Sequence, residues 1–236
     1  MQAVQLLTCI RFPERWQKEG AGLEEGMAYA PFVGVLIGAG LALSLAAGAL
    51  IDIWLGALSG LFFWLGITGF LHADGLADLA DGLGASHGDK DRLLEVMREP
   101  HIGSFGVLAL ALLISAKLIL LMLILKTGVP LLALVLVPAW TRLGSLIWLK
   151  SLPPLGNGMA AVCREGVSPE MMVFWVVALS AVSLFLAPAL LLAPLLLLAW
   201  RYFLKLKLQG VSGDCIGAGI EICEAGLLFL LVIIHA

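Results

Sequence analysis

The chain has 236 residues, of which 61% are hydrophobic and 13% charged, and its mean hydropathy is +1.04. A soluble globular domain carries about 25% charged residues, so this composition predicts an integral membrane protein. The formal net charge of −3, without any long basic run, argues against nucleic acid as a partner. The four cysteines include no CxxC pair, so neither a zinc site nor a disulfide framework is indicated.

Seven windows are apolar and long enough to cross a bilayer, which takes about 20 residues. We expect them at residues 28–50, 53–72, 104–125, 129–149, 171–187, 188–204 and 219–235. Only "APA" around Pro188 divides the fifth from the sixth, and Pro194 interrupts the same stretch, so one long broken segment is the alternative. With no internal repeat, residues 1–236 are expected to form one all-α, polytopic bundle of about seven helices.

Basic residues favour the cytoplasmic side of a membrane and therefore predict the orientation. With the N-terminus inside, the outer face receives only Lys126, whereas the inner face receives Arg11, Arg15, Lys18, Lys90, Arg92, Arg98, Lys150, Arg164, Arg201, Lys205 and Lys207. We expect a multi-pass protein of the cell inner membrane. Segments 73–103, 150–170 and 205–218 should then share its cytoplasmic face.

The stretch "GFLHADGLADLADG", residues 69–82, directly follows an apolar window. Asp74, Asp78 and Asp81 are separated by four and three residues, so a helix places them on one face. Stacked carboxylates need a cation, and hard oxygen ligands suit Mg²⁺, usually shared with substrate phosphates. The three aspartates are therefore predicted metal ligands, with a solvated acidic loop as the alternative. His72 is predicted to orient a carboxylate or to donate to a phosphate. The alternative is a histidine that merely lies at the membrane interface.

The next stretch, "GDKDRLLEVMREPHIGSFG", runs from residue 88 to 106. Asp89 can cap a short helix with an apolar stripe, which we expect to lie along the cytoplasmic surface. A plain connector, with Arg92 and Arg98 touching lipid headgroups, is the alternative. The glycines of "HIGSFG" allow its backbone to approach a phosphate closely.

A second acidic group occurs in "LQGVSGDCIGAGIEICEAG", residues 208–226. Asp214 lies in a glycine-rich turn, and Glu221 and Glu224 follow on the first turns of the last predicted span. Ionisable residues inside a span are costly and usually functional, so these residues are candidates for a second metal ion or a substrate cation. Pairing with Arg142, or with Lys205 and Lys207, is the alternative.

Two basic residues fall within predicted spans. Arg142 lies a few residues from the cytoplasmic end of the fourth span, where it can clamp a phosphate or neutralise an aspartate. Lys117 lies near the middle of the third span and is a further candidate for a buried cation, with simple pairing to a neighbouring carboxylate as the alternative. Two carboxylate groups at the cytoplasmic mouth of the bundle predict Mg²⁺-assisted transfer at a phosphate, with an aspartate taking the proton of an attacking hydroxyl.

Three motifs carry a resemblance to a known family. "GFLHADGLADLADG", "RLLEVMREPHIGSFG" and "GVSGDCIGAGIEICEA" are similar, in this order, to the cobalamin synthase family, also called adenosylcobinamide-GDP ribazoletransferase. The resemblance runs from "RFP" at residues 11–13, through "TR" at 141–142, to the last span. It implies a Mg²⁺-dependent membrane transferase that joins α-ribazole, or its 5′-phosphate, to adenosylcobinamide-GDP and releases GMP.

Carried onto this sequence, the resemblance implies three groups of site residues. The metal ligands are Asp74, Asp78, Asp81, Asp214, Glu221 and Glu224, with Asp78 and Asp81 as catalytic residues. In the second motif the resemblance implies Glu95, Arg98, Gly103 and Ser104 as substrate-binding residues, and the residue patterns described above add His72 and Arg142 to that set. The chain departs from the family pattern at Arg98-Glu99, where Lys-Asp is usual, and at Ser212, where threonine is usual.

Other functions remain open on sequence grounds. A CDP-alcohol phosphotransferase or an intramembrane prenyltransferase uses similar aspartate clusters, although "DGLADLADG" lacks the arginine that the former expects. A transporter, the non-enzyme alternative, predicts ionisable groups near mid-membrane and inverted symmetry. Membrane lipid is an expected partner, and a homo-oligomer is compatible with the sequence.

Overall fold

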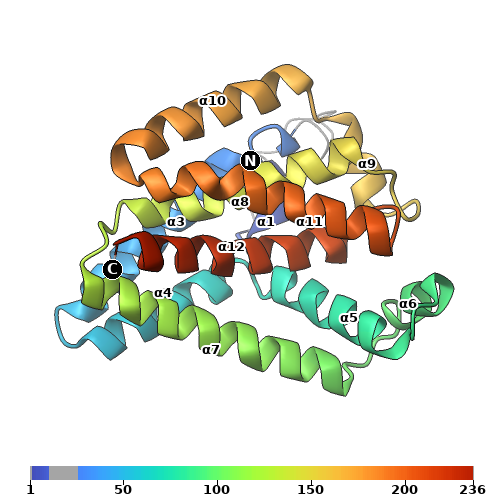
Figure 1. Ribbon diagram of the computed structural model, residues 1–236, viewed down its shortest axis with the longest axis horizontal. Helices are drawn as coiled ribbons and strands as arrows, with labels where there is room; N and C mark the ends of the chain where they lie inside the picture. The colour runs from blue at the N-terminus through green and yellow to red at the C-terminus, as the bar shows by residue number, and fades with distance from the viewer. Residues whose placement is uncertain (1, 11–25, 236) are drawn as a thin grey trace.

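The computed structural model describes residues 2–10 and 26–235. Within these ranges the chain is helical, without any strand beyond a single bridge between Pro154 and Val211. In chain order the helices are α1 (Gln2–Leu7), α3 (Ala30–Ala49), α4 (Ile53–Ile67), α5 (Leu71–Ala85), α6 (Lys90–Val96), α7 (Ser104–Thr127), α8 (Ala133–Ser151), α9 (Met159–Glu165), α10 (Pro169–Leu186), η2 (Pro188–Leu192), α11 (Ala193–Lys207) and α12 (Gly213–His235). Most of the long helices run along the longest axis of the molecule (Figure 1).

The described ranges hold six helices long and apolar enough to span a membrane, or seven if α4 and α5 together make one broken span. The predicted polytopic all-α bundle is therefore confirmed. The fifth and sixth spans are separate, as expected, because α10 ends at Leu186 and the 3₁₀ turn η2 begins at Pro188. Asp89 also caps α6 as predicted, since its Oδ1 accepts from the amide of Asp91 at 2.9 Å.

The second predicted span, residues 53–72, is wrong as a continuous helix. Helix α4 ends at Ile67, and α5 leaves it at an angle of 84°. The turn contains Gly69 and Phe70, both with φ of +61°, a left-handed conformation that disfavours helix continuation. At about 1.5 Å per residue, α4 is too short to cross the hydrocarbon alone. The break redirects the chain so that α5 carries the acidic stretch along the bundle.

Helix α8 is the most buried of the spanning helices. Helix α3 packs directly on it because two glycines leave room: a Cβ on Gly34 would lie 2.4 Å from the carbonyl oxygen of Pro138, and one on Gly38 would lie 2.6 Å from that of Leu134. Small residues of this kind permit close helix approach within a membrane.

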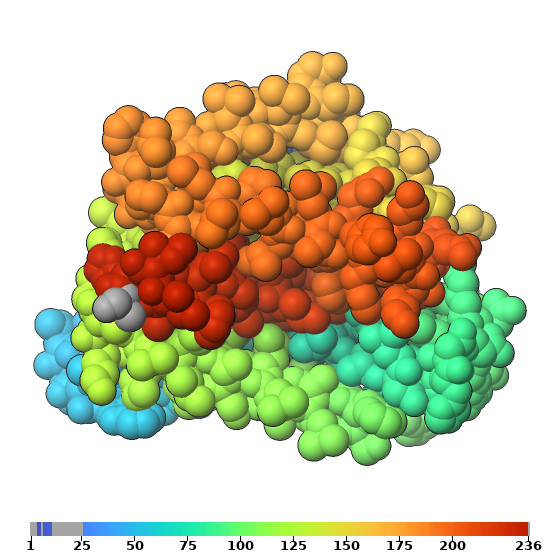
Figure 2. All heavy atoms as spheres, in the orientation of Figure 1, coloured from blue at the N-terminus to red at the C-terminus, as the bar shows by residue number. Residues whose placement is uncertain are grey.

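In Figure 2, α11 and α12 lie across the viewed face between α10 above and α7 below.

The polar segments gather at one end of the bundle. Figure 1 shows α5, α6, α9 and the turn between α11 and α12 at this end, while α12 finishes at the other. The loop after α8 is tied to the start of α12, because the amide of Leu155 donates to the carbonyl of Val211 at 3.0 Å. The side of the membrane on which this end lies stays a prediction, and Arg11, Arg15 and Lys18 fall outside the described residues.

Candidate functional site

Helices α5 and α12 meet through two glycines. A Cβ on Gly75 would lie 2.7 Å from the Cα and carbonyl oxygen of Asp214, and one on Gly217 would lie 3.1 Å from the Cα of His72. Any side chain at Gly75 would therefore push the two backbones apart. This close approach brings the predicted first and third acidic motifs side by side.

Asp74, Asp78 and Asp214 form what we call the carboxylate cluster. Asp74 is exposed, whereas Asp78 and Asp214 are half-buried. The carboxylates of Asp74 and Asp214 both repel that of Asp78. In the described part of the chain, no basic side chain makes an ion pair with any of the three. The cluster is thus a concentration of negative charge without a protein counter-ion among the residues described.

The carboxylate cluster suits a metal ion shared with a substrate. Among the described residues, no three His, Cys, Asp or Glu side chains stand close enough to hold a metal by themselves. Mg²⁺ rarely uses such an all-protein cage and is usually bound through one or two carboxylates together with substrate phosphates and water. The unneutralised charge and the hard oxygen donors fit this second arrangement, in which one or two of Asp74, Asp78 and Asp214 would hold the ion.

Asp81 lies on the same helix but has different partners. It is 7% exposed, and its two oxygens accept from the backbone amides of Gly103 at 2.7 Å and Gly106 at 2.9 Å. These amides belong to the first turn of α7, where helical N–H groups have no intrahelical acceptor. A Cβ on either glycine would lie 2.4 Å from the Asp81 carboxylate. The structure therefore gives Asp81 the role of anchoring "HIGSFG", which the aspartate spacing did not predict.

Glu221 and Glu224 lie apart from the carboxylate cluster, inside the bundle. Helix α12 begins at Gly213, earlier than predicted, so Glu221 lies about two turns inside it. Lys117 Nζ contacts Glu221 Oε2 at 2.5 Å and Glu224 Oε2 at 2.6 Å, and Arg142 Nη1 contacts Glu224 Oε1. Both glutamates are thus paired with basic residues, so their contacts do not support their assignment as metal ligands.

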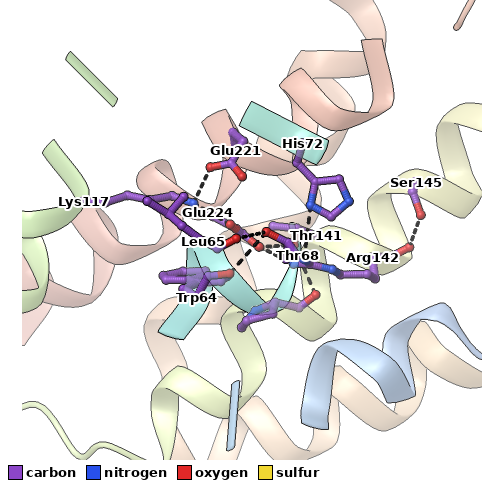
Figure 3. A network of polar contacts seen from close by, with 11 residues as sticks. Trp64, Leu65, Thr68, His72, Lys117, Thr141, Arg142, Ser145, Glu221 and Glu224 are labelled. Atoms are coloured by element: carbon purple, nitrogen blue, oxygen red, sulfur yellow. Dashed lines mark hydrogen bonds and ion pairs between the residues drawn. The ribbon is translucent and has the colours of Figure 1, made fainter. Parts of the chain in front are cut away.

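We call Lys117, Arg142, Glu221 and Glu224 the buried charge cluster (Figure 3). All four residues are at most 2% exposed. Their formal charges balance, and the Lys117 ammonium also lies 4.2 Å from the centre of the Trp64 ring, a favourable cation–π arrangement. Balanced pairing is what allows ionised groups to persist at such depth. Sequence reasoning included pairing of the glutamates with Arg142, and pairing of Lys117 with a neighbouring carboxylate, as alternatives, without identifying Glu221 and Glu224 as the partners of Lys117.

His72 connects the buried charge cluster to the polar end. Its side chain is 4% exposed, and its Nδ1 lies 3.5 Å from Arg142 Nη2. Thr141 lies beside the same guanidinium and accepts from Arg142 Nη1 at 3.2 Å. Arg142 is fully buried, and its guanidinium contacts Glu224 and lies beside His72. It therefore helps to hold both of these side chains in place. The predicted use of Arg142 as a phosphate clamp is not what these contacts show.

Two cavities adjoin the carboxylate cluster, and both are lined by Asp214. The apolar cavity, of about 280 Å³, is lined by Leu7, Met27, Leu71, His72, Ser145, Leu149, Met159, Ala160, Cys163, Gly213, Asp214, Ile216 and Gly217. The polar cavity, of about 250 Å³, is lined by Leu94, Met97, Arg98, Leu155, Gly156, Asn157, Gly158, Met159, Ala160, Val211, Ser212, Gly213 and Asp214. Asp214 therefore borders both cavities, together with Met159, Ala160 and Gly213.

Of the other residues predicted to bind substrate, one lines a cavity and two lie exposed on the surface. Arg98 lines the polar cavity, whereas Glu95 is exposed and paired with Arg92 at 2.7 Å. Ser104 is exposed at the start of α7. The loop at residues 155–158 was missed as a cavity wall, since it carries no charged residue, although its two glycines signal a turn.

Comparisons with known proteins agree on one family. A family model described as cobalamin-5-phosphate synthase matches residues 1–233. Proteins named adenosylcobinamide-GDP ribazoletransferase are similar to this chain: one from Laribacter hongkongensis is 48% identical over 98% of this chain and 95% of its own length, and one from Novosphingobium aromaticivorans is 45% identical over 98% and 94%. A third, from Thiobacillus denitrificans, is 42% identical over 97% and 92%. No solved structure matches. The chain belongs to the cobalamin-5-phosphate synthase family.

Proposed function

We propose that this protein catalyses the last step of cobalamin assembly, in which α-ribazole, or its 5′-phosphate, is joined to adenosylcobinamide-GDP. The names of its relatives support the reaction. The observation that carries the proposal is the carboxylate cluster, which has no ion-paired basic residue in the described chain and adjoins two cavities. A reaction that joins two substrates at a charged pyrophosphate needs carboxylates that can bind a metal ion, and it needs room for each substrate. The carboxylate cluster and the two cavities meet these two requirements.

The chemistry is a displacement at phosphorus. Because the 5′ oxygen of α-ribazole 5′-phosphate is already esterified, the nucleophile is a ribose hydroxyl that is free in both forms of the substrate. This hydroxyl attacks the phosphorus that is bonded to the cobinamide side of the pyrophosphate. A new P–O bond forms, the bond to the bridging oxygen breaks, and GMP leaves with that oxygen. Mg²⁺ bound by the substrate phosphates and the carboxylate cluster would neutralise charge on the pyrophosphate oxygens. With α-ribazole 5′-phosphate, the same hydroxyl attacks, GMP leaves in the same way, and the product keeps the 5′-phosphate.

Each acidic residue of α5 has a distinct part in this proposal. Asp74 of α5 and Asp214 of α12 would hold the metal ion that the substrate phosphates share. Asp78, half-buried near the carboxylates of Asp74 and Asp214, takes the proton of the attacking hydroxyl as a general base. Asp81 keeps the amides of Gly103 and Gly106 in place and acts as a positioning residue.

The bundle orientation completes the proposal, because basic residues gather at the polar end, among them Lys90 of α6, Arg164 of α9 and Lys205 of α11. We place the polar end, with the carboxylate cluster, at the cytoplasmic face of the cell inner membrane. The transporter alternative has less support from the structure. Its mid-membrane ionisable groups are present in the buried charge cluster, but they are paired with one another.

The direct test incubates purified protein with adenosylcobinamide-GDP, α-ribazole and Mg²⁺, and follows GMP and the corrinoid product by chromatography. We expect both products in equal amounts from the parent protein and none from Asp78→Asn, which removes charge at nearly constant volume. Asp91→Asn, an exposed change on α6, is the matched control and should retain the parent rate. Turnover with a CDP-alcohol pair and none with these substrates would reject the assignment.

A further inference from the structure

The apolar cavity has features that the transfer chemistry at the carboxylate cluster does not use. We propose that it binds the aromatic base of the nucleoside substrate, with the Nε2–H of His72 as the hydrogen-bond donor to that base. The inference rests on the proposed function, because it identifies which of the two cavities takes the nucleoside. It assigns the base-binding subsite and one specificity-determining residue.

The lining and size of the apolar cavity favour a flat aromatic group. Its walls are mainly aliphatic and thioether side chains, including Leu149, Met159 and Ile216, with few polar groups among them. Small-molecule sites typically combine such walls with a few placed polar atoms. A volume of about 280 Å³ accommodates a bicyclic base. The polar cavity, with Arg98, Asn157 and Ser212, is better suited to a charged nucleotide.

The surroundings of His72 fix which of its ring nitrogens donates. Arg142 is always protonated and has only donors, so His72 Nδ1, at 3.5 Å from Nη2, must be the accepting nitrogen. The single proton of the neutral ring is then on Nε2. Within the described chain Nε2 has no hydrogen-bond partner, and the side chain lines the apolar cavity. Figure 3 shows the imidazole of α5 beside the Arg142 guanidinium of α8.

A benzimidazole nucleoside offers the complementary acceptor. One ring nitrogen of its base carries the ribose, and the other carries an in-plane lone pair. A hydrogen bond from His72 Nε2 to that second nitrogen orients the base. Asp214 lines both cavities, so the ribose of a nucleoside held in this way lies toward the carboxylate cluster. The buried charge cluster thereby has a function beyond stability. Because Arg142 donates to Nδ1 of His72, it keeps the proton of the ring on Nε2, from which His72 can donate to the base.

The first test measures steady-state kinetics of His72→Leu, with His72→Gln as the conservative variant and His235→Leu, at the far end of α12, as the control. Loss of one buried hydrogen bond should raise KM for α-ribazole roughly tenfold, with KM for adenosylcobinamide-GDP unchanged. His72→Gln, whose amide can donate, should recover part of the affinity. Equal rises in both KM values would indicate a general disruption and overturn the inference.

The second test does not depend on turnover or on His72. Ile216 lines only the apolar cavity, and Ile216→Phe should reduce α-ribazole binding, measured by equilibrium dialysis without the second substrate. Parent-like binding by Ile216→Phe and parent-like KM values in His72→Leu would overturn the subsite, while product formation by the parent protein would leave the proposed function standing. A parent protein that neither binds α-ribazole nor forms product would overturn both.

Discussion

Asp74, Asp78 and Asp81 share one face of α5, but their surroundings give them different tasks. Asp74 is exposed and Asp78 is half-buried near other carboxylates, whereas Asp81 is buried against the amides that begin α7. A negative charge at a helix N-terminus is also favoured by the helix dipole. The sequence spacing predicts the shared face. It does not predict the role of Asp81, because that depends on where the chain returns after α6.

Stability distinguishes these roles. Asp81→Asn should lower the free energy of unfolding by about 1–3 kcal/mol, because an asparagine has one acceptor oxygen and leaves one buried amide without its partner. Asp74→Asn should leave stability at or slightly above the parent value, because it removes a repulsive charge. Denaturant unfolding in a fixed detergent measures both. A parent-like stability of Asp81→Asn would contradict the anchoring role.

At the scale of the elements, the buried charge cluster joins α7, α8 and α12. Lys117 comes from α7, Arg142 from α8, and Glu221 and Glu224 from α12. Charge pairing across helices specifies the rotation of each helix about its axis, which a uniformly apolar surface does not do. In the sequence these residues are isolated charges in apolar windows. Their partners could only be proposed, because periodicity does not say which helices are neighbours.

Single and double variants of the cluster test this pairing. Lys117→Met should destabilise the protein by about 3–5 kcal/mol, because it leaves buried glutamate charge uncompensated. Lys117→Met combined with Glu221→Gln should recover part of this loss, since Arg142 still pairs with Glu224. Lys126→Met, an exposed change on the same helix, is the control. Thermal unfolding would contradict the pairing if the double variant were less stable than Lys117→Met alone.

At the scale of the whole molecule, hydropathy predicts most of the bundle. The windows for α3, α7, α8 and α10 agree with the observed helices to within a few residues. The 84° break between α4 and α5 could not be predicted, because it depends on left-handed backbone at Gly69 and Phe70. The close approach of Gly75 to Asp214 also comes only from the structure. Those two features decide which acids lie together.

The orientation is open to a direct labelling experiment. Glu99→Cys at the polar end and Lys126→Cys at the opposite end replace exposed residues. In sealed right-side-out vesicles, a membrane-impermeant maleimide should label Lys126→Cys and leave Glu99→Cys unlabelled until the membrane is opened. The exposed Cys9 is replaced by serine in both proteins. The reverse pattern would place the carboxylate cluster outside the cytoplasm.

The central claim is that acids from α5 and α12 hold one metal-bound pyrophosphate. Electron paramagnetic resonance of Mn²⁺, used in place of Mg²⁺ with adenosylcobinamide-GDP present, measures this directly. Asp74→Asn and Asp214→Asn should each weaken Mn²⁺ binding by roughly tenfold or more, since even the supporting partners of metal ligands contribute on that scale. Asp91→Asn should bind as the parent does. Parent-like Mn²⁺ affinity in both Asp74→Asn and Asp214→Asn would contradict the account.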